Sequence, residues 1–170
     1  MDREMVLQLS NEQLYDEFVE NVLTNAIGLE GLVSELEQSS RFKEDFIFRI
    51  HVQTARQFIL VCQQKSDAVL EKAEELIERA HTLELPKILT LNYHILGNAY
   101  RFLNFLEKAL ECFMNVLKYS RIYNLNNLTS IVYFYISELY MTHDDVNTGL
   151  EYLNRAFSTL EETKDKEPRY

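Results

Sequence analysis

The sequence predicts an all-α protein built from repeated pairs of antiparallel helices, and three observations support this fold class. The chain of 170 residues contains only two Pro and four Gly, which is typical of helices joined by short turns. No run alternates apolar and polar residues long enough to indicate a strand. Bulky residues also recur at helical spacing, and the pattern around Tyr93 returns forty residues later around Tyr133. A recurring unit of this length predicts a helical repeat.

The clearest unit lies in the middle of the chain. Tyr93, Leu96 and Tyr100 stand at positions i, i+3 and i+7, so they share one face of a helix. Gly97 interrupts this helix, and a Gly inside a helix costs about 1 kcal/mol relative to Ala. That cost is explained if a return helix approaches the backbone at Gly97, near the small Ala109. We therefore expect a close antiparallel pair in which aromatic side chains fill the remaining gaps.

A second copy of the packing positions follows at a shift of forty residues. Bulky positions stay bulky and small positions stay small, and the pairs are Tyr93 and Tyr133, Leu96 and Ile136, Gly97 and Ser137, Tyr100 and Tyr140, Ala109 and Gly149, and Phe113 and Leu153. A half copy precedes the middle unit, because Ala73, Ile77 and Ala80 match its second helix at a shift of thirty-six residues. An ordinary helical hairpin with a chance Leu-Gly pair is the alternative, and it does not explain the further copies.

The residue spacing of the middle unit resembles that of a known repeat. Counted from Thr90, the unit has an aromatic residue at position four, Leu-Gly at seven and eight, Tyr at eleven, Ala at twenty and Phe at twenty-four. This pattern resembles the tetratricopeptide repeat, a helix–turn–helix unit. The match departs at Val116, where a second small residue is usual, and at Arg121, where Pro is usual. The resemblance implies a right-handed superhelix of antiparallel helix pairs, with about seven to eight helices.

Taken in order, the predicted elements are a helical cap at 1–40, a degenerate repeat at 41–85, a full repeat at 86–125, a further repeat at 126–163 and a polar tail at 164–170. In the cap, Ser10 and Gln13 have the spacing of a capping box. An apolar stripe from Leu14 through Phe18 and Val22 to Ile27 predicts the first helix of the cap, with a break near Gly28 and Gly31 before a short second helix.

The repeats are expected to contain six longer helices. The first runs unbroken from Arg41 to Gln64, with Phe42, Phe46, Ile50 and Leu60 toward the core. The others are expected at 68–83, from Pro86 to the turn at Asn104, and at 106–123, 128–141 and 146–161. Pro86 suits the first turn of its helix, where a missing N–H group is tolerated.

Composition excludes several classes of function and location. The net charge of −10 argues against a nucleic-acid-binding surface, because such surfaces concentrate Lys and Arg. The first residues form no apolar run long enough for a signal sequence or a membrane span, so we expect a cytoplasmic protein that binds no membrane. Cys62 and Cys112 both fall within predicted helices, where we expect packed, unpaired thiols rather than a disulfide.

No constellation of residues supports an enzyme. None of the four histidines pairs at i, i+4 with another His or a carboxylate in the manner of a helical metal site, so no metal site or cofactor is expected. His143-Asp144 is better interpreted as a turn cap than as part of a metal phosphohydrolase site, because no partner residues are present. Glycine-rich phosphate loops, paired CxxC motifs and nucleophile elbows are also absent from the sequence.

The resemblance implies that positions two, five, nine and twelve of each first helix line a concave groove. These positions are Leu91, His94, Asn98 and Arg101 in the full repeat, Ile131, Phe134, Glu138 and Met141 in the last, and Ala55, Phe58, Cys62 and Lys65 in the degenerate one if Ala73 sets its frame. By resemblance, Asn98 holds the backbone of an extended peptide, and Arg101 can pair with a carboxylate. The alternative is that both are solvated residues. Phe58, Phe134 and Met141 indicate an apolar-to-mixed groove, or else core packing.

The function expected from the resemblance is a non-catalytic module that binds a protein or peptide segment. Arrays with repeats of about forty residues resemble the regulatory domains of bacterial signalling proteins, such as diguanylate cyclases and peptide-responsive regulators. The alternative is a scaffold that forms homodimers through its terminal repeat. In the last helix, Leu150, Leu153 and Phe157 fit the stripe that packs on the preceding helix, whereas Ala156 and Leu160 lie partly off it. Ala156 and Leu160 are therefore the expected outward contacts.

Overall fold

A computed structural model describes residues 1–123 and 125–166, and over these residues the protein contains helices and no strand. The ten α-helices are α1 (Arg3–Gln8), α2 (Glu20–Thr24), α3 (Glu30–Glu37), α4 (Ser40–Glu44), α5 (Phe46–Cys62), α6 (Leu70–Thr82), α7 (Pro86–Phe102), α8 (Leu106–Tyr123), α9 (Asn126–Thr142) and α10 (Val146–Lys166). A π-helical turn, Leu14–Val19, leads into α2, and a 3-10 turn, Ser66–Ala68, leads into α6. The all-α prediction is confirmed. The expected helix number is too low, because the N-terminal region forms several short helices.

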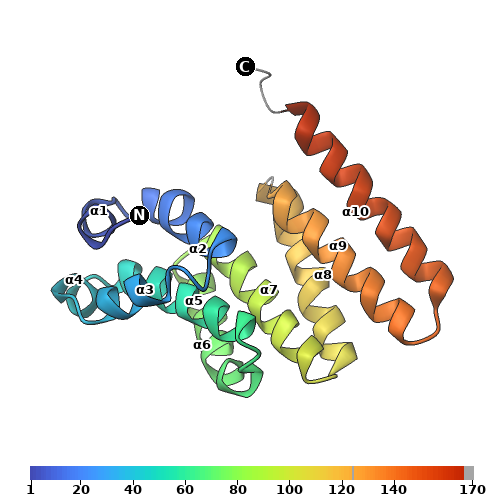
Figure 1. Cartoon of the computed structure of the whole chain (residues 1–170), viewed down its shortest axis with the longest axis horizontal. Helices are drawn as coiled ribbons and strands as arrows, with labels where there is room; N and C mark the ends of the chain where they lie inside the picture. The colour runs from blue at the N-terminus through green and yellow to red at the C-terminus, as the bar shows by residue number, and fades with distance from the viewer. Residues whose placement is uncertain (124, 167–170) are drawn as a thin grey trace.

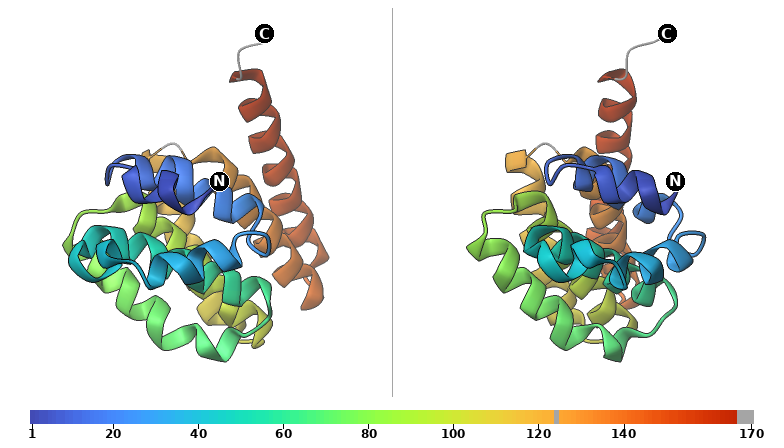
Figure 2. Two further views of the ribbon diagram at one scale, coloured as in Figure 1. Left: turned by 60° about the vertical axis from the view of Figure 1, so that its left-hand side comes forward. Right: turned by 90° about the vertical axis from the view of Figure 1, so that its left-hand side faces the viewer.

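Helices α5 to α10 follow one another across the molecule in the order of the sequence (Figure 1). Each packs on its successor, with α7 on α8 and α9 on α10 forming the most extensive pairs. At the other end, the short helices α2, α3 and α4 pack on α5, and α1 packs on α3 (Figure 1). Figure 2 shows the C-terminal half of α10 projecting beyond the other helices. The array thus ends on a helix with one side left uncovered by the described chain.

The same backbone turn ends successive helices at intervals of twenty residues. Gln64, Glu84, Asn104 and Asp144 have positive φ angles of 59°, 54°, 62° and 61°. At each turn the next N–H group donates to a carbonyl five residues earlier, in the pairs Lys65 to Leu60, Leu85 to Ala80, Phe105 to Tyr100, Leu125 to Ser120 and Asp145 to Tyr140, with N···O distances of 2.9, 2.9, 2.9, 2.9 and 3.1 Å. This is the Schellman motif, and its spacing gives a structural repeat of two helices every forty residues.

These turns correct the frame of the degenerate repeat. Gln64 occupies the place of Asn104, so the first repeat lies forty residues before the middle one rather than thirty-six. Leu60 then corresponds to Tyr100, and Ala73 corresponds to Phe113 instead of Ala109. The frame taken from Ala73 is wrong because a small residue also fills a position where later repeats have a large one.

Close contact at the predicted glycine is present. A Cβ atom added to Gly97 would lie 2.6 Å from Cε1 and 2.8 Å from Cδ1 of Phe113, and 3.1 Å from Cβ of Cys112. Gly149 makes the equivalent approach from α10, where an added Cβ would lie 2.5 Å from Cγ of Met141 and 3.1 Å from the carbonyl oxygen of Ser137. The two pairs therefore approach through Gly, as expected, although the partner of Gly97 is Phe113 rather than Ala109.

The other predicted packing residues lie between the helices. Leu96, Tyr100, Ala109, Phe113, Ile136 and Ser137 are buried, whereas Tyr93, Tyr133, Tyr140 and Leu153 are half-buried. Tyr93 stacks on Tyr119 of α8, and Tyr140 stacks on Tyr152 of α10, with ring centroids 5.9 and 5.6 Å apart. Tyr133 also contacts Tyr152, at 6.0 Å. Aromatic rings on the first helix of a pair thus contact rings on the second, and these contacts fix the orientation of the two helices relative to each other.

The N-terminal cap is formed partly as expected. Ser10 Oγ accepts from the Gln13 N–H group at 3.3 Å, and Gln13 Oε1 accepts from the Ser10 N–H group at 3.0 Å, so the capping box is confirmed. Ile27 is 75% exposed, because the helix ends at Thr24 and Ile27 lies in the following turn. Its predicted place on the buried stripe is wrong.

The predicted long helix from Arg41 to Gln64 is broken at Asp45. Its backbone is extended, and its carboxylate accepts from the Phe48 N–H group at 3.0 Å, so it starts a new helix. The change of direction buries Phe48 and leaves Phe46 40% exposed, which corrects the expected core position.

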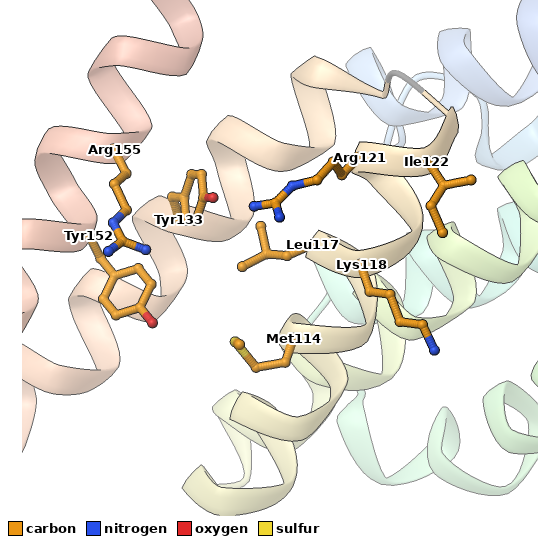
Figure 3. A pocket seen from close by; sticks show the side chains of 8 residues that line it. All are labelled: Met114, Leu117, Lys118, Arg121, Ile122, Tyr133, Tyr152 and Arg155. Carbon is orange, nitrogen blue, oxygen red and sulfur yellow. The ribbon is translucent and has the colours of Figure 1, made fainter.

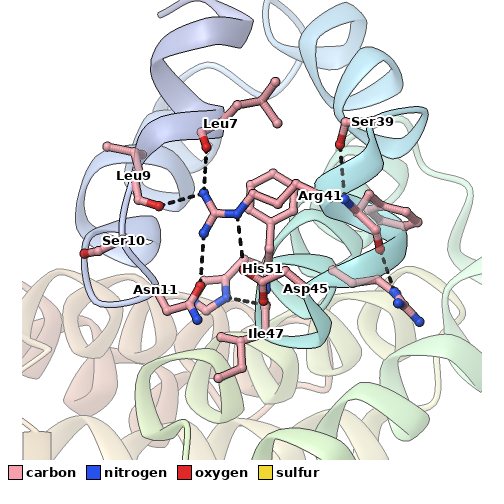
Figure 4. A network of polar contacts seen from close by, with 12 residues as sticks. Leu7, Leu9, Ser10, Asn11, Ser39, Arg41, Asp45, Ile47 and His51 are labelled. Atoms are coloured by element: carbon pink, nitrogen blue, oxygen red, sulfur yellow. Dashed lines mark hydrogen bonds and ion pairs between the residues drawn. The ribbon is translucent and has the colours of Figure 1, made fainter.

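Arg41 joins the two parts of the cap. Its Nη1 donates to the carbonyl groups of Leu7 and Leu9 at 3.0 and 2.7 Å, and its Nη2 donates to Asn11 Oδ1 at 3.1 Å (Figure 4). Its Nε donates to Asp45 at 3.2 Å. A single side chain therefore holds the N-terminal segment against the start of α5.

Three further predictions are tested at the ends and on the surface. Helix α10 continues to Lys166, so the predicted tail at 164–170 begins inside a helix, and residues 167–170 lie outside the described chain. Cys112 is buried, but Cys62 is exposed, so only one thiol is packed as expected. Within the described ranges, no helix is both long and apolar enough to cross a membrane.

Candidate protein interaction surfaces

His94 and Asn98, predicted to line an open groove, are buried at 4% and 3% exposure. The His94 ring lies between Phe58 of α5 and Tyr135 of α9, with centroid distances of 6.2 and 5.8 Å. Asn98 Nδ2 donates to the His94 carbonyl at 3.0 Å and lies 3.2 Å from His94 Nε2. The amide of Asn98 is therefore engaged inside the protein, and its predicted role in holding a peptide backbone is wrong.

The histidine in this network is neutral at pH 7. Burial, with the nearby charge of Arg101, lowers the pKa of His94 from 6.5 to about 4. A neutral ring with a free lone pair on Nε2 matches donation from Asn98, which places the proton on Nδ1. His94 Nδ1 is itself buried with no hydrogen-bond partner among the described residues. The ring therefore contributes packing between three helices rather than a ligand contact.

Arg101 links α7 to α9. Its Nη1 donates to Glu138 Oε2 at 2.8 Å, and its Nε donates to Asn98 Oδ1 at 3.3 Å. Its guanidinium lies 4.5 Å from the ring centroid of Phe102 and 4.6 Å from that of Tyr135. The carboxylate that Arg101 was expected to bind in a ligand is thus supplied by Glu138 of the same chain.

A row of side chains, two exposed and two half-buried, remains on this side of the molecule. It consists of Phe102, Arg101, Tyr135 and Phe134, and is called here the aromatic row. Arg101 lies over Phe102 and Tyr135, and the Tyr135 ring meets Phe134 edge-on at 6.1 Å. Phe102 and Phe134 are 44% and 51% exposed. The sequence indicated Phe134 as a groove position, but Phe102, which follows position twelve, was missed.

The remaining predicted groove residues lie in different environments. Phe58 is half-buried against His94. Met141 is half-buried over Gly149, between α9 and α10, so its predicted groove position is wrong. In the corrected frame, the first repeat places His51, Thr54, Phe58 and Val61 at the groove positions. Of these, only Phe58 is not buried.

The outer side of α10 carries a second exposed surface, called here the α10 stripe. Val146, Leu150, Phe157 and Leu160 are 52%, 47%, 58% and 41% exposed, and Leu153 is half-buried between them. Ala156, expected to point outward, is 6% exposed, and its carbonyl accepts from Ser130 Oγ of α9 at 3.0 Å. The expected roles of Ala156, Leu150 and Phe157 are therefore wrong, because the small residue makes the close contact and the large ones lie outside.

The same positions of α8 show what such a stripe does. Forty residues upstream they are Leu106, Leu110, Phe113, Leu117 and Ser120, all half-buried or buried. Helix α9 packs on α8, and the ring of Phe113 contacts Tyr135 of α9. The α10 stripe thus occupies the same positions on its helix as the side of α8 that packs against α9.

Among residues 1–123 and 125–166, no group of three or more His, Cys, Asp or Glu side chains is arranged to hold a metal ion. No family model matches the sequence, and neither a curated protein nor a solved structure gives a significant match. The tetratricopeptide resemblance therefore rests on residue spacing alone.

Proposed function

We propose that this chain is a non-catalytic interaction module that binds a segment of another protein across the aromatic row. The observation that carries the proposal is an arginine that lies over the rings of Phe102 and Tyr135, beside the exposed Phe134. Aromatic residues and Arg are enriched at protein interfaces and provide most of the residues that dominate binding energy. Here the two phenylalanines, Phe102 and Phe134, are about half exposed.

The aromatic row is supported from below by packed side chains. Arg101 is paired with Glu138, and Tyr135 lies against both His94 and Phe113. Little side-chain freedom is then lost when a partner docks, and this lowers the entropic cost of binding. Because the Arg101 charge is already paired, we expect apolar and aromatic side chains of the partner, rather than a carboxylate, to make the main contacts.

A selection from random dodecapeptides tests this proposal. One class of the peptides recovered on the wild-type protein is expected to bind Phe102→Ala/Phe134→Ala at least tenfold more weakly, because truncating central interface residues commonly costs about 2 kcal/mol or more. The matched control is Met5→Ala/Ile27→Ala, which removes two exposed apolar side chains from the cap. If every recovered peptide binds the wild type and the aromatic-row variant equally well, this surface is excluded as a binding site.

Self-association through the α10 stripe is a second candidate, because that stripe matches a surface that α9 covers on α8. Its expected partner is a second copy of the chain. Sedimentation of the wild type against Leu160→Glu tests it, with Phe157→Glu as a second variant on the same stripe. A dimer of the wild type that dissociates in both variants supports the candidate. A strict monomer for all three proteins at high concentration excludes it.

A regulatory role in a bacterial signalling protein, such as a diguanylate cyclase or a peptide-responsive regulator, is the wider context that we propose. It rests on the resemblance of the repeats alone. The reading frame around the chain in its genome tests it: a catalytic or DNA-binding domain in the same polypeptide would support the role.

A further inference from the structure

A groove of about 420 Å³ lies between α8 and α10, with α9 behind it. Three cationic residues border this groove: Lys118 and Arg121 on α8, and Arg155 on α10. Figure 3 shows the guanidinium group of Arg121 extending from α8 toward Tyr133, and that of Arg155 lying beside the Tyr152 ring on α10. Two helices that are far apart in the sequence thus bring positive charge to the two sides of one groove.

The three cations have no anionic partner in the described chain. No carboxylate of the described residues lies within ion-pair distance of Lys118, Arg121 or Arg155, although the sequence has 27 acidic residues against 17 Lys and Arg. Arg155 lies over the Tyr152 ring at 5.1 Å, which holds its side chain beside the groove without neutralising it. In an acidic protein, this gathering of unpaired positive charge attracts an anionic group.

The lining is also apolar. Leu117 is almost buried, while Met114 and Ile122, which border the same groove, are 52% and 60% exposed. Tyr133 and Tyr152 add ring surfaces together with hydroxyl groups that can donate to an anion. The groove therefore offers an apolar contact and charged donors within one space.

We propose that this groove docks an acidic segment of a partner protein, in which an apolar side chain lies between carboxylates. The guanidinium groups of Arg121 and Arg155 match carboxylates in shape and can bind them through two hydrogen bonds each. The apolar side chain covers Met114 and Leu117. A nucleic acid is disfavoured, because the net charge of −10 repels a long polyanion. A free inorganic anion leaves the apolar lining exposed.

This site is separate from the aromatic row. Tyr133, at the back of the groove, and Tyr135 of the aromatic row are two residues apart on α9, which corresponds to about 200° around a helix. The two surfaces share no residue, so each can be changed without altering the other.

The test uses random dodecapeptides displayed on phage and selected on the wild-type chain. Recovered peptides are sorted by anisotropy measurements on Arg121→Glu/Arg155→Glu and on Phe102→Ala/Phe134→Ala. The matched control for charge is Arg3→Glu/Lys43→Glu, which makes the same change in net charge on the cap. Arg121, Arg155 and Lys43 are exposed, and Arg3 is half-exposed, so unchanged melting by circular dichroism is expected for both charge variants.

The expected result is a class of peptides rich in Asp or Glu with at least one Phe, Leu or Met. Their affinity should fall at least tenfold on Arg121→Glu/Arg155→Glu, change less than twofold on the control and on the aromatic-row variant, and weaken as salt is raised. The proposal is overturned if no such class is recovered, or if its peptides bind the charge-reversed groove as well as the wild type. It is also overturned if inorganic phosphate alone displaces them fully, or if the wild type sediments as a dimer that Arg121→Glu/Arg155→Glu dissociates. Peptides whose affinity falls only for the aromatic-row variant bind at the aromatic row and therefore test the proposed function, not the groove.

Discussion

Replacing Gly97 by Ala separates two opposing effects that the structure places at one residue. Helix propensity alone favours the substitution by about 1 kcal/mol. The new Cβ atom, however, would stand 2.6 and 2.8 Å from two ring carbons of Phe113, closer than real Cβ contacts. Phe113 is fully buried, and its ring is also held by Tyr135 at a centroid distance of 5.8 Å, so it cannot swing aside freely. Overpacking of this kind costs about 1–3 kcal/mol.

The net expectation is that Gly97→Ala leaves the free energy of unfolding unchanged or lowers it by up to about 2 kcal/mol. Gly31 is the control, since an added Cβ there meets nothing within 4 Å on the exposed side of α3. Gly31→Ala should therefore raise stability, by up to about 1 kcal/mol. Urea unfolding followed by far-ultraviolet circular dichroism measures both differences.

A double-mutant cycle identifies the atom responsible. In the Phe113→Leu background the ring carbons are gone, so Gly97→Ala should recover its propensity gain. The expected coupling energy between the two positions is about 1–3 kcal/mol. If Gly97→Ala stabilises the wild type as much as Gly31→Ala does, the close approach of α7 and α8 at this point is refuted.

Three further predictions concern single side chains. Burial raises the pKa of Cys112 to about 12, whereas Cys62 is exposed. A thiol reagent should therefore label only Cys62 in the native protein and both cysteines in urea. Equal labelling of the two cysteines in the native chain would contradict the packing of α8. The pKa of His94 falls from 6.5 to about 4 on folding, so the unfolded chain binds more protons between these values. The stability contributed by neutral His94 is present above pH 6.5 and is lost toward pH 4, by on the order of 3 kcal/mol. The free energy of unfolding in urea should therefore fall more steeply on acidification for the wild type than for His94→Gln. Parallel curves of this free energy against pH would refute the prediction. Arg41→Ala should speed amide hydrogen exchange in α1 without changing exchange in α7 and α8, because Arg41 binds the Leu7 and Leu9 carbonyls. Mass spectrometry measures this exchange. An unchanged exchange rate in α1 would show that other contacts hold the cap.

Local spacing by itself determined much of the helical framework. The i, i+3, i+7 pattern around Tyr93 predicted which side of α7 meets α8, and the Gly97 and Gly149 positions predicted where the paired helices approach most closely. The Ser10 and Gln13 pair predicted a capping box that is present. These features were accessible because each depends on residues within one or two turns of the same helix, where periodicity relates sequence directly to position.

The frame of the first repeat was not accessible from side-chain types. Its turn is set by a backbone hydrogen-bond pattern with Gln64 at positive φ, where Gly is the usual signal. A single small residue, Ala73, then suggested the wrong shift. A backbone conformation adopted by an ordinary residue leaves no mark in the sequence, so the frame became visible only through the repeated hydrogen bonds.

Tertiary structure alone decided which residues of the candidate surfaces are exposed and which are buried. Asn98 stands at a groove position by count, yet its surroundings are closed by Phe58 of α5 and Tyr135 of α9, which stack on His94. The α8–α10 groove joins Arg121 and Arg155, which no local pattern relates. Helical periodicity determines which way a side chain leaves its own helix. Whether it then meets solvent, a ring or an opposite charge depends on residues that only the packing of distant helices brings near.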